Sequence, residues 1–359
     1  MPHGKLGNKL IKKIMKILII GNLGYVGSQL VKYLKMKYSN YYLIGYDIGY
    51  FSHCITSEGP VPEVFLDKQY YGDVRDFPEN ILSEVDVVIN LAAISNDPMG
   101  KMFSEITKEV NHLSAIRIAK LASNYKVGHY VYASSCSIYG AAEGSAKIES
   151  DKLNPLTAYA ISKANSEIEL EKMKKNDMIV TALRFSTACG VSDRLRLDLV
   201  LNDFVASAVL NNKIEILSDG TPWRPLIDVH DMCRAIDWAS QRQLNDKEFI
   251  KVNIGRDDWN FQVKDLATAV SNLIPSVEIS INENAQPDKR SYKVDFSLFS
   301  KIAPEFNPIK NLDETIIELK ETIEKFVLFK EDFRKGNLIR FNVLKNHLNK
   351  KKFDKNLRF

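Results

Sequence analysis

The sequence has little of what a disulfide-bonded, metal-binding or membrane-spanning protein needs. Its 359 residues include only four cysteines, which are widely scattered and form no CxxC pair: Cys54, Cys136, Cys189 and Cys233. This pattern predicts reduced thiols of a cytoplasmic protein, with no zinc site. No apolar run approaches the roughly 18–20 residues that span a bilayer. The net charge of +4 is too small to require a nucleic-acid partner, but it is compatible with anionic small molecules as ligands.

The two ends of the chain differ in composition from the rest. Residues 1–14 are basic and superficially suggest a signal peptide, but the apolar run that follows is short and no small-residue cleavage site appears. We expect an N-terminal extension, with Met15 as an alternative start. Residues 330–359 are basic with interleaved Phe, Leu and Ile. Such a tail is compatible with a membrane-surface, subunit or nucleic-acid contact. We favour a helix that packs on its own protein and ends in a frayed segment.

A glycine-rich segment near the start predicts a dinucleotide site. The apolar run KILII, typical of a central parallel strand, leads directly into GNLGYVG. Gly21 permits a tight turn, Gly24 lets a pyrophosphate approach the backbone, and Gly27 lets the following helix pack closely on the strand. The N-terminus of that helix offers free N–H groups to phosphates, with Tyr25 and Val26 among the expected contacts.

Acidic residues after the next strands favour NAD over NADP. The strand YYLIGYD ends at Asp47, about 20 residues past the last glycine, where an acid binds the adenosine ribose hydroxyls. A carboxylate at this place repels a ribose 2′-phosphate. Asp73, followed by Val74, is a candidate contact for the adenine. The strand in VDVVINLAAIS adds further expected cofactor contacts, Leu91, Ala92 and Ala93.

Tyr159 and Lys163 are predicted to form the catalytic pair. HYVYASS reads as the fifth strand, and ligands of open α/β sheets bind beyond the carboxyl ends of strands. Tyr159 and Lys163 lie four residues apart in a helical pattern and therefore share a face. A nearby ammonium, together with a cationic nicotinamide ring, would lower the tyrosine pKa from its usual value of about 10. The phenolate could then take a proton from a substrate hydroxyl, while Lys163 also holds the nicotinamide ribose.

As an ordered set, these segments resemble the extended short-chain dehydrogenase/reductases, and specifically their nucleotide-sugar epimerase/dehydratase group. The resemblance spans most of residues 16–325. Its segments are GNLGYVG, Asp47, Asp73, NLAA, ASSCSIYG, YAISK, RFSTACG, RPLIDVHD and DKRSY.

The resemblance implies an α/β fold, a Rossmann doubly wound parallel sheet of six to seven strands with a smaller, discontinuous C-terminal substrate-binding lobe. We expect the NAD-binding domain to comprise residues 15–185 plus about 226–256, where LIDVHDMCRAIDWAS returns as strand and helix. Residues 186–225 plus 257–329 are expected to form the nucleotide-sugar-binding lobe. In relatives, the helices that correspond to 106–123 and 159–173 pair with a second subunit, which implies a homodimer.

The stretch ASSCSIYG narrows the chemistry. In relatives, the hydroxyl that assists the tyrosine lies four residues before the tyrosine of the YG pair, which is Ser135 here. Sugar 4,6-dehydratases carry Asp and Glu at the next two positions, where this chain has Cys136 and Ser137 and so lacks their acid and base. Cys136 is one residue away from the cysteine of C3/C5 epimerases and is expected to be a packed thiol. Ser134 is expected to be structural or to face the cofactor.

Arginines in the second half are candidates for binding a diphosphate, because the guanidinium fork can donate two hydrogen bonds at once. By the resemblance, Arg224 and Arg290 are predicted to clamp the diphosphate of a nucleotide sugar. Arg196, or as a weaker alternative Arg194, is predicted to reach a phosphate or the sugar.

The segments SDRLRLDLVLNDF and TPWRPLIDVHD are most similar to a sub-branch that includes GDP-heptose 4-dehydrogenases and related C4 epimerases. We therefore expect NAD-dependent oxidation or epimerisation at C4 of a nucleotide-diphosphate sugar. Two alternatives stay open, a reductase of a 4-keto nucleotide sugar and a non-catalytic dinucleotide-sensing protein. The sequence fixes neither the base, nor the sugar, nor the direction of the reaction.

Overall fold

A seven-stranded parallel sheet forms the centre of the molecule. The structure is a computed structural model and describes residues 14–142, 144–243, 248–282, 285, 290–326 and 332–359. The order of its strands is β10 (Phe249–Ile254), β6 (Ile179–Phe185), β5 (His129–Ser135), β4 (Val87–Asn90), β1 (Lys16–Ile20), β2 (Tyr42–Asp47) and β3 (Lys68–Tyr71). This is the doubly wound Rossmann order, so the predicted fold class is confirmed. The expected N-terminal extension falls, apart from Ile14, outside the described residues.

Both faces of the sheet are covered by helices, as the continuous apolar strands require. Helices α1 (Tyr25–Lys37) and α7 (Val229–Gln241) contact each other and pack on the face that Ile17 and Ile19 of β1 point to. On the other face, Leu18 and Ile20 join a core with α4 (Ser114–Asn124). The remaining helices of this part are α5 (Ala158–Lys172), α2 (Asp97–Met102), α3 (Ser104–Lys108), a π-helical turn (Glu109–Leu113), η1 (Pro62–Phe65), η2 (Val74–Asp76), η3 (Glu79–Leu82) and η5 (Cys136–Tyr139).

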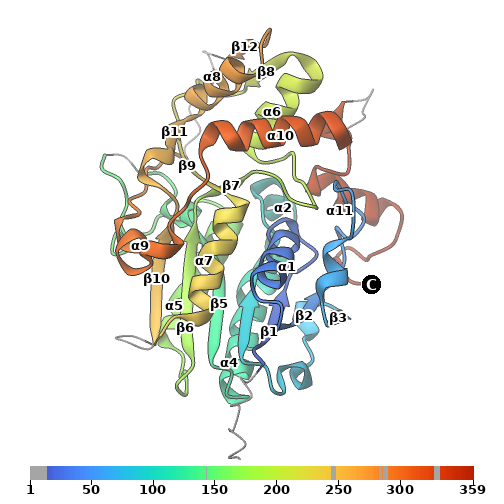
Figure 1. Cartoon of the computed structure of the whole chain (residues 1–359), viewed down its shortest axis with the longest axis vertical. Coiled ribbons are helices and arrows are strands. Elements are labelled where there is room, and N and C mark those ends of the chain that lie inside the picture. The colour runs from blue at the N-terminus through green and yellow to red at the C-terminus, as the bar shows by residue number, and fades with distance from the viewer. Residues whose placement is uncertain (1–13, 143, 244–247, 283–284, 286–289, 327–331) are drawn as a thin grey trace, which may run out of the picture.

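A smaller lobe lies at one end of the large sheet (Figure 1). It contains a three-stranded sheet of β11 (Asn260–Gln262), β9 (Trp223–Asp228) and β7 (Thr187–Cys189), and a pair of β12 (Glu278–Ile281) and β8 (Lys213–Ile216). Its longer helices are α6 (Val200–Asn211), α8 (Val263–Leu273) and α10 (Leu312–Phe326). Short helices η6 (Asp257–Trp259), α9 (Ser297–Ile302) and η7 (Pro304–Phe306) complete the connections.

The segment expected to return to the NAD-binding domain as strand and helix adds only its helix to the layers of the large sheet. Helix α7 packs on α1, but the strand before it, β9, pairs with β7 and β11 and not with the large sheet. The seventh strand is β10, which pairs with β6 from Phe249 onward. A short apolar run such as PLIDV does not reveal its partner, because strand pairing is set by distant segments. The domain boundaries proposed from the sequence stay a prediction.

The basic tail folds onto its own chain. Helix α11 (Arg340–Asn349), preceded by η8 (Phe333–Lys335), packs through Leu344 into a cluster with Tyr50 and Met99. The expectation of a frayed end is wrong, because Leu357 is fully buried and its carbonyl accepts a hydrogen bond from the Tyr50 hydroxyl.

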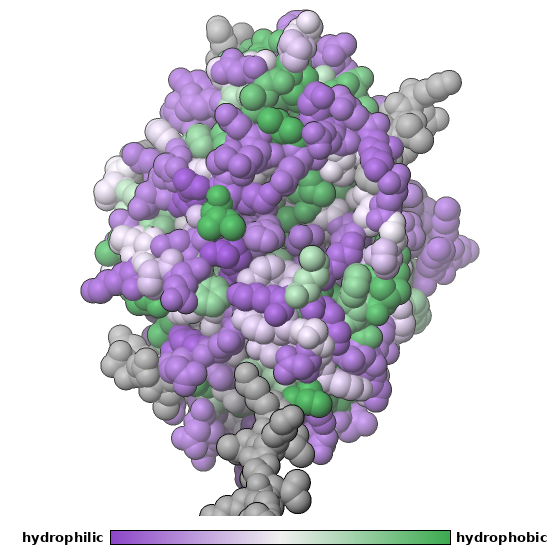
Figure 2. Space-filling model, viewed as in Figure 1, coloured by the Kyte–Doolittle hydropathy of each residue, from purple (hydrophilic) through white to green (hydrophobic). Residues whose placement is uncertain are grey.

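The described helices include none that combines the length and the apolar character needed to cross a membrane. On the face drawn in Figure 2, polar residues predominate and apolar residues form separate groups.

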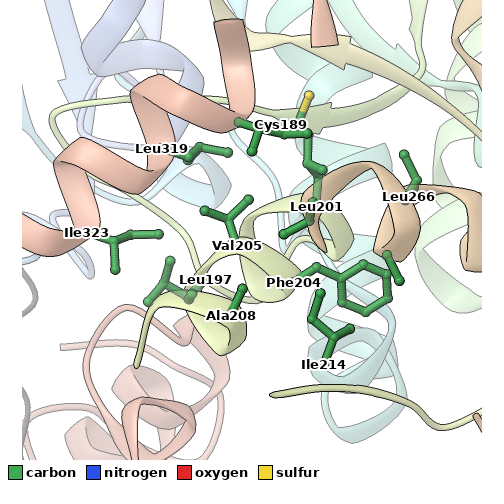
Figure 3. Packing of buried hydrophobic residues seen from close by; sticks show 14 of the residues in the cluster. Cys189, Leu197, Leu201, Phe204, Val205, Ala208, Ile214, Leu266, Leu319 and Ile323 are labelled. Atoms are coloured by element: carbon green, nitrogen blue, oxygen red, sulfur yellow. The ribbon is translucent and has the colours of Figure 1, made fainter. Parts of the chain in front are cut away.

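The smaller lobe has its own apolar core, built around one side of α6. In Figure 3, Leu201 and Phe204 of α6 lie among side chains from α8 and α10, including Leu266 and Leu319. Leu201 and Leu266 are fully buried, so this core holds the lobe's helices together.

We predict that Leu201→Ala lowers the free energy of unfolding by about 2–5 kcal/mol, because it leaves a cavity in this core. The control is Leu217→Ala, since the Leu217 side chain is 82% exposed and its truncation should cost less than about 0.5 kcal/mol. Urea unfolding of both variants measures the difference. Equal losses would show that the α6 core does not stabilise the lobe.

Candidate active site

A cavity of about 430 Å³ lies between the carboxyl ends of the central strands and the smaller lobe. It sits where the strand order reverses between β1 and β4, which is the usual ligand site of such sheets. Apart from the alternative Arg194, its wall includes every residue that the sequence assigned to cofactor, catalysis or substrate: Gly21, Gly24, Tyr25, Val26, Gly27, Asp47, Asp73, Val74, Leu91, Ala92, Ala93, Ser135, Tyr159, Lys163, Arg196, Arg224 and Arg290. Their individual roles stay predictions.

The glycine-rich loop has the close contacts that its sequence predicted. Gly21 has a φ of +89°, and a Cβ there would lie 2.7 Å from the backbone nitrogen of Ala92. A Cβ on Gly27 would lie 2.3 Å from the Gly21 carbonyl oxygen, so helix and strand approach as closely as expected. Helix α1 starts after Gly24 and has no acidic residue in its first turn. Its N-terminus, on the cavity wall, is therefore suited to an anion.

Two acids mark the other end of the cofactor part of the cavity. The carboxylate of Asp47 accepts backbone hydrogen bonds from Leu23 (3.0 Å) and Gly49 (2.7 Å), one on each oxygen. Each oxygen keeps a further lone pair for a hydroxyl donor. Burial raises the pKa of Asp47. Asp73 caps η2 and forms an ion pair with Arg75 at 2.6 Å.

Tyr159 and Lys163 lie in the first two turns of α5, whose start is capped by the Thr157 side chain. The Lys163 ammonium donates to the Ala133 carbonyl oxygen at 2.5 Å and lies 5.7 Å from the centre of the Tyr159 ring. Burial lowers the pKa of Lys163 to about 7. It also raises the pKa of Tyr159 to about 12, against the opposing influence of Ser135 and Arg196. The protein's own groups therefore do not produce the lowered tyrosine pKa that the sequence analysis expected.

A buried ion pair fixes α5 against the strands that carry the rest of the site. Glu167, one turn after Lys163, binds the guanidinium of Arg184 on β6 at 2.6 Å, and both side chains are at least 97% buried. The Ser134 hydroxyl of β5 donates to the same carboxylate at 2.5 Å. Arg184 also donates to the Tyr139 hydroxyl at 2.9 Å. Ser134 thus has a structural contact, and it also lies on the cavity wall, so both of its expected roles stay predictions.

The Cys136 thiol and the Ser137 hydroxyl, which follow Ser135, differ in their hydrogen-bond partners. Cys136 is fully buried, its Sγ donates to the Arg184 carbonyl oxygen at 3.0 Å, and burial raises its pKa, so it is the packed thiol expected. By contrast, the hydroxyl of Ser137 is buried at the cavity wall and has no hydrogen-bond partner in the described part of the chain. Buried polar atoms of this kind are normally satisfied, which fits a ligand at this place.

The candidate arginines are held by partners that the sequence analysis missed. Arg196 forms an ion pair with Asp198 at 3.0 Å and donates to the Ser95 hydroxyl at 3.0 Å. Arg290 pairs with Asp97. The side chain of Arg224 donates to the Arg290 carbonyl oxygen, so these two arginines lie together.

The alternative that placed Arg194 at the ligand is wrong. Arg194 is fully buried away from the cavity wall, where it forms an ion pair with Glu63 at 2.5 Å and donates to the Ser28 hydroxyl at 2.9 Å. It joins the loop after β7 to helix α1.

The cavity wall includes further residues, and only some of them stand in a sequence pattern that predicts their position. The sequence NDP follows the strand of NLAA, and this helix-start pattern could have placed Asp97 at the sheet edge. Asp198 carries no comparable signal. Arg340 of the tail also lines the cavity, although it lies far from every motif.

Comparison with known proteins places the chain in a family. The model of the NAD dependent epimerase/dehydratase family matches residues 17–255. The chain belongs to this family. The family's cofactor confirms the prediction of NAD, and the resemblance to nucleotide-sugar epimerases and dehydratases is confirmed at the level of the group.

Individual relatives are distant. Protein CapI of Staphylococcus aureus is 28% identical over 62% of this chain and 68% of its own length. UDP-glucuronic acid decarboxylase 6 of Arabidopsis thaliana is 24% identical over 93% of each chain. The structure of UDP-N-acetylglucosamine 4-epimerase from Methanobrevibacter ruminantium M1, in complex with UDP-N-acetylmuramic acid, is similar with a TM-score of 0.70 at 21% identity, covering 88% of this chain and 99% of its own. This last likeness confirms the fold.

We predict that Tyr159 stays protonated up to pH 10 in the protein alone, and that NAD⁺ shifts its ionisation below pH 10. The reason is that burial raises its pKa to about 12, whereas a cationic ring beside the phenol would stabilise the phenolate. The measurement is the phenolate absorbance of the wild type minus that of Tyr159→Phe. NADH, whose ring lacks the positive charge, is the control. An equal shift with NADH, or none with NAD⁺, would contradict this explanation.

Proposed function

We propose that this protein is an NAD-dependent oxidoreductase that acts at C4 of a nucleotide-diphosphate sugar, as a 4-dehydrogenase or a 4-epimerase. One observation carries the proposal. Tyr159 and Lys163 share a cavity with the glycine-rich loop on one side and with Arg224 and Arg290 of the smaller lobe on the other. The names of the compared proteins support the substrate class, since they include UDP-N-acetylglucosamine 4-epimerase and UDP-glucuronic acid decarboxylase.

The cofactor half of the cavity has a group for each part of a dinucleotide. The N-terminus of α1 after Gly24 suits the diphosphate, Asp47 the adenosine ribose, and Lys163 the nicotinamide ribose. When bound, NAD supplies the hydride chemistry at the substrate carbon.

The protein's own part in the reaction is proton transfer. Tyr159 takes the proton of the C4 hydroxyl, and Ser135 hydrogen-bonds the same hydroxyl and holds it in place. The charge of Lys163 stabilises the phenolate that Tyr159 must become, because opposite charges favour the ionised form. The arginines neutralise the nucleotide diphosphate and fix the distance of the sugar from Tyr159.

The side chains beside Ser135 favour a reaction confined to C4. Elimination of water from a 4-keto sugar needs an acid and a base next to the ketone. The two positions after Ser135 offer only a packed thiol with a raised pKa at Cys136 and a hydroxyl at Ser137. The reverse reaction, reduction of a 4-keto nucleotide sugar, uses the same residues. A non-catalytic sensing role is disfavoured because Tyr159 and Lys163 both line the cavity.

We also propose a homodimer that pairs the helical stretches 106–123 and 159–173. Their outer surface carries three large apolar side chains, Leu113, Ile161 and Ile168, which are 49%, 45% and 44% exposed. Ile161 and Ile168 lie seven residues apart on α5 and so share one stripe of that helix. A second copy of the same face would cover these side chains.

We predict that Tyr159→Phe lowers turnover of the nucleotide-sugar substrate by at least about 100-fold, because the proton acceptor is lost. Candidate UDP-, GDP-, CDP- and dTDP-sugars are screened by NADH absorbance and by product analysis. The dissociation constant for NAD should change less than about twofold. The control is Tyr71→Phe, because Tyr71 is 67% exposed. Full activity of Tyr159→Phe would overturn the mechanism, and unchanged sugars with every substrate would overturn the proposed function.

We predict that light scattering gives twice the mass of one chain for the wild type and the mass of one chain for Ile168→Glu, because a buried carboxylate at this face is not paired. Met36→Glu on α1 is the control, since Met36 is 83% exposed and lies on another helix. A monomeric wild type, or a dimeric Ile168→Glu variant, would exclude this interface.

A further inference from the structure

The C-terminal strap, residues 332–359, joins separate parts of the cavity wall. Near its start, the Leu338 carbonyl oxygen accepts a hydrogen bond from the Leu197 backbone at 3.0 Å, in the loop after β7. Near its end, the Asn356 carbonyl oxygen accepts from the Arg75 guanidinium at 2.8 Å, beside Asp73. The strap therefore runs from the loop of the smaller lobe to the acids at the adenosine end of the cofactor part.

One side chain of the strap, Arg340, reaches the cavity wall itself. It is 1% exposed, and its guanidinium donates to the carbonyl oxygens of Arg194 (2.6 Å), Leu195 (3.1 Å) and Asn337 (3.3 Å). It also lies 5.1 Å from the centre of the Phe51 ring. Within the described ranges, Arg340 forms no ion pair with a carboxylate.

A buried cation without a counter-ion is costly, which is why such groups are normally paired. Burial lowers the pKa of Arg340 to about 10, so the guanidinium stays charged at neutral pH. Asp198 is the acid that acts on it electrostatically, but that carboxylate already pairs with Arg196. Arg196 and Arg194 are themselves cations and repel it. This corner of the cavity thus has an excess of positive charge.

The position of Arg340 indicates which anionic ligand its positive charge is suited to bind. The loop that receives its hydrogen bonds packs on the first turn of α1, where the Tyr25 hydroxyl donates to the Gly190 carbonyl oxygen at 2.6 Å. The Ser192 hydroxyl donates to the Tyr25 carbonyl oxygen at 2.6 Å. Phe51, under the guanidinium, follows Asp47 by four residues. Arg340 is therefore held to a loop that packs on the first turn of α1, the part of the cavity that suits a diphosphate.

We propose that Arg340 binds the diphosphate of the dinucleotide, so that the C-terminal strap is part of the cofactor site. The proposal rests on the NAD site and not on the chemistry at C4. It gives a binding role to the tail, which lies outside the glycine-rich loop and all of the family's motifs, since these end before residue 326. The nucleotide-sugar diphosphate is the competing ligand, and its candidate clamps are Arg224 and Arg290, which are joined by the hydrogen bond from Arg224 to the Arg290 carbonyl oxygen.

The test compares ADP with adenosine, which differ by the diphosphate alone. Both are titrated by calorimetry into the full-length protein freed of bound nucleotide. Arg340→Met should weaken the binding of ADP and NAD by about 10- to 100-fold, the effect of one lost hydrogen bond to a charged group. The affinity for adenosine should change less than about twofold. The ratio of the two affinities cancels any general loosening of the site. Arg340→Lys keeps the charge but not the two-pronged guanidinium, so it should lose less affinity for ADP than Arg340→Met.

Controls and contrary outcomes separate this role from a structural one. Arg334→Met removes a strap arginine that instead pairs with Asp203 at 2.9 Å, and it should leave the ADP-to-adenosine ratio unchanged. If Arg340→Met does not fold, the same ratio in Arg340→Lys decides the question. An unchanged ratio, or equal losses for ADP and adenosine, would overturn the proposal. A loss of UDP affinity in the NAD-loaded protein without a loss of ADP affinity would also overturn it. None of these measurements needs turnover, so they stand apart from the test of the C4 reaction.

Discussion

The geometry of the site depends on the ion pair between Glu167 and Arg184. It joins α5 to β6 in the interior, and Ser134 of β5 donates to the same carboxylate. Removing one partner of such a pair costs about 3–5 kcal/mol, because the other charge is left buried and unpaired. The pair lies one turn beyond Lys163, so it sets the register of α5 and thereby where Tyr159 meets Ser135. The candidate catalytic residues Tyr159 and Lys163 are thus held in place by the packing of α5.

Positive charge is the second organising feature. The cavity collects the N-terminus of α1, Lys163 and the guanidinium groups of Arg196 and Arg340. Burial lowers the pKa of Lys163 to about 7 and raises that of Tyr159 to about 12, so both residues are held in the neutral form more than in water. Anionic ligands would reverse this balance for the cations, since a nearby negative charge favours the charged form. In the proposed function, ligand binding and activation of Tyr159 would therefore be coupled through the electrostatics of one cavity.

The sequence predicted those parts of the structure that local pattern determines. The glycine spacing, the apolar strands and the i, i+4 pair predicted the sheet, the first helix and α5, and the residues assigned to the site, apart from the alternative Arg194, line one cavity. Long-range pairing was not accessible: the sequence predicted a strand and a helix returning to the first domain, and the strand, β9, pairs within the three-stranded sheet. Arg194 and Arg196 show the same limit, because two arginines two residues apart differ only in which packed surface each one meets. The composition of the tail predicted a helix that packs on its own protein, but nothing local shows where it docks or that Arg340 reaches the cavity.

The measurement that tests the central claim most directly is a crystal structure of the protein with NAD and a nucleotide sugar. The account predicts that the Tyr159 hydroxyl lies within about 3 Å of the sugar's C4 hydroxyl and faces the reactive edge of the nicotinamide ring. α5 should be held by Glu167 and Arg184 as it is here. A sugar bound with another carbon at Tyr159, or a Tyr159 hydroxyl turned away from the ring, would contradict the account.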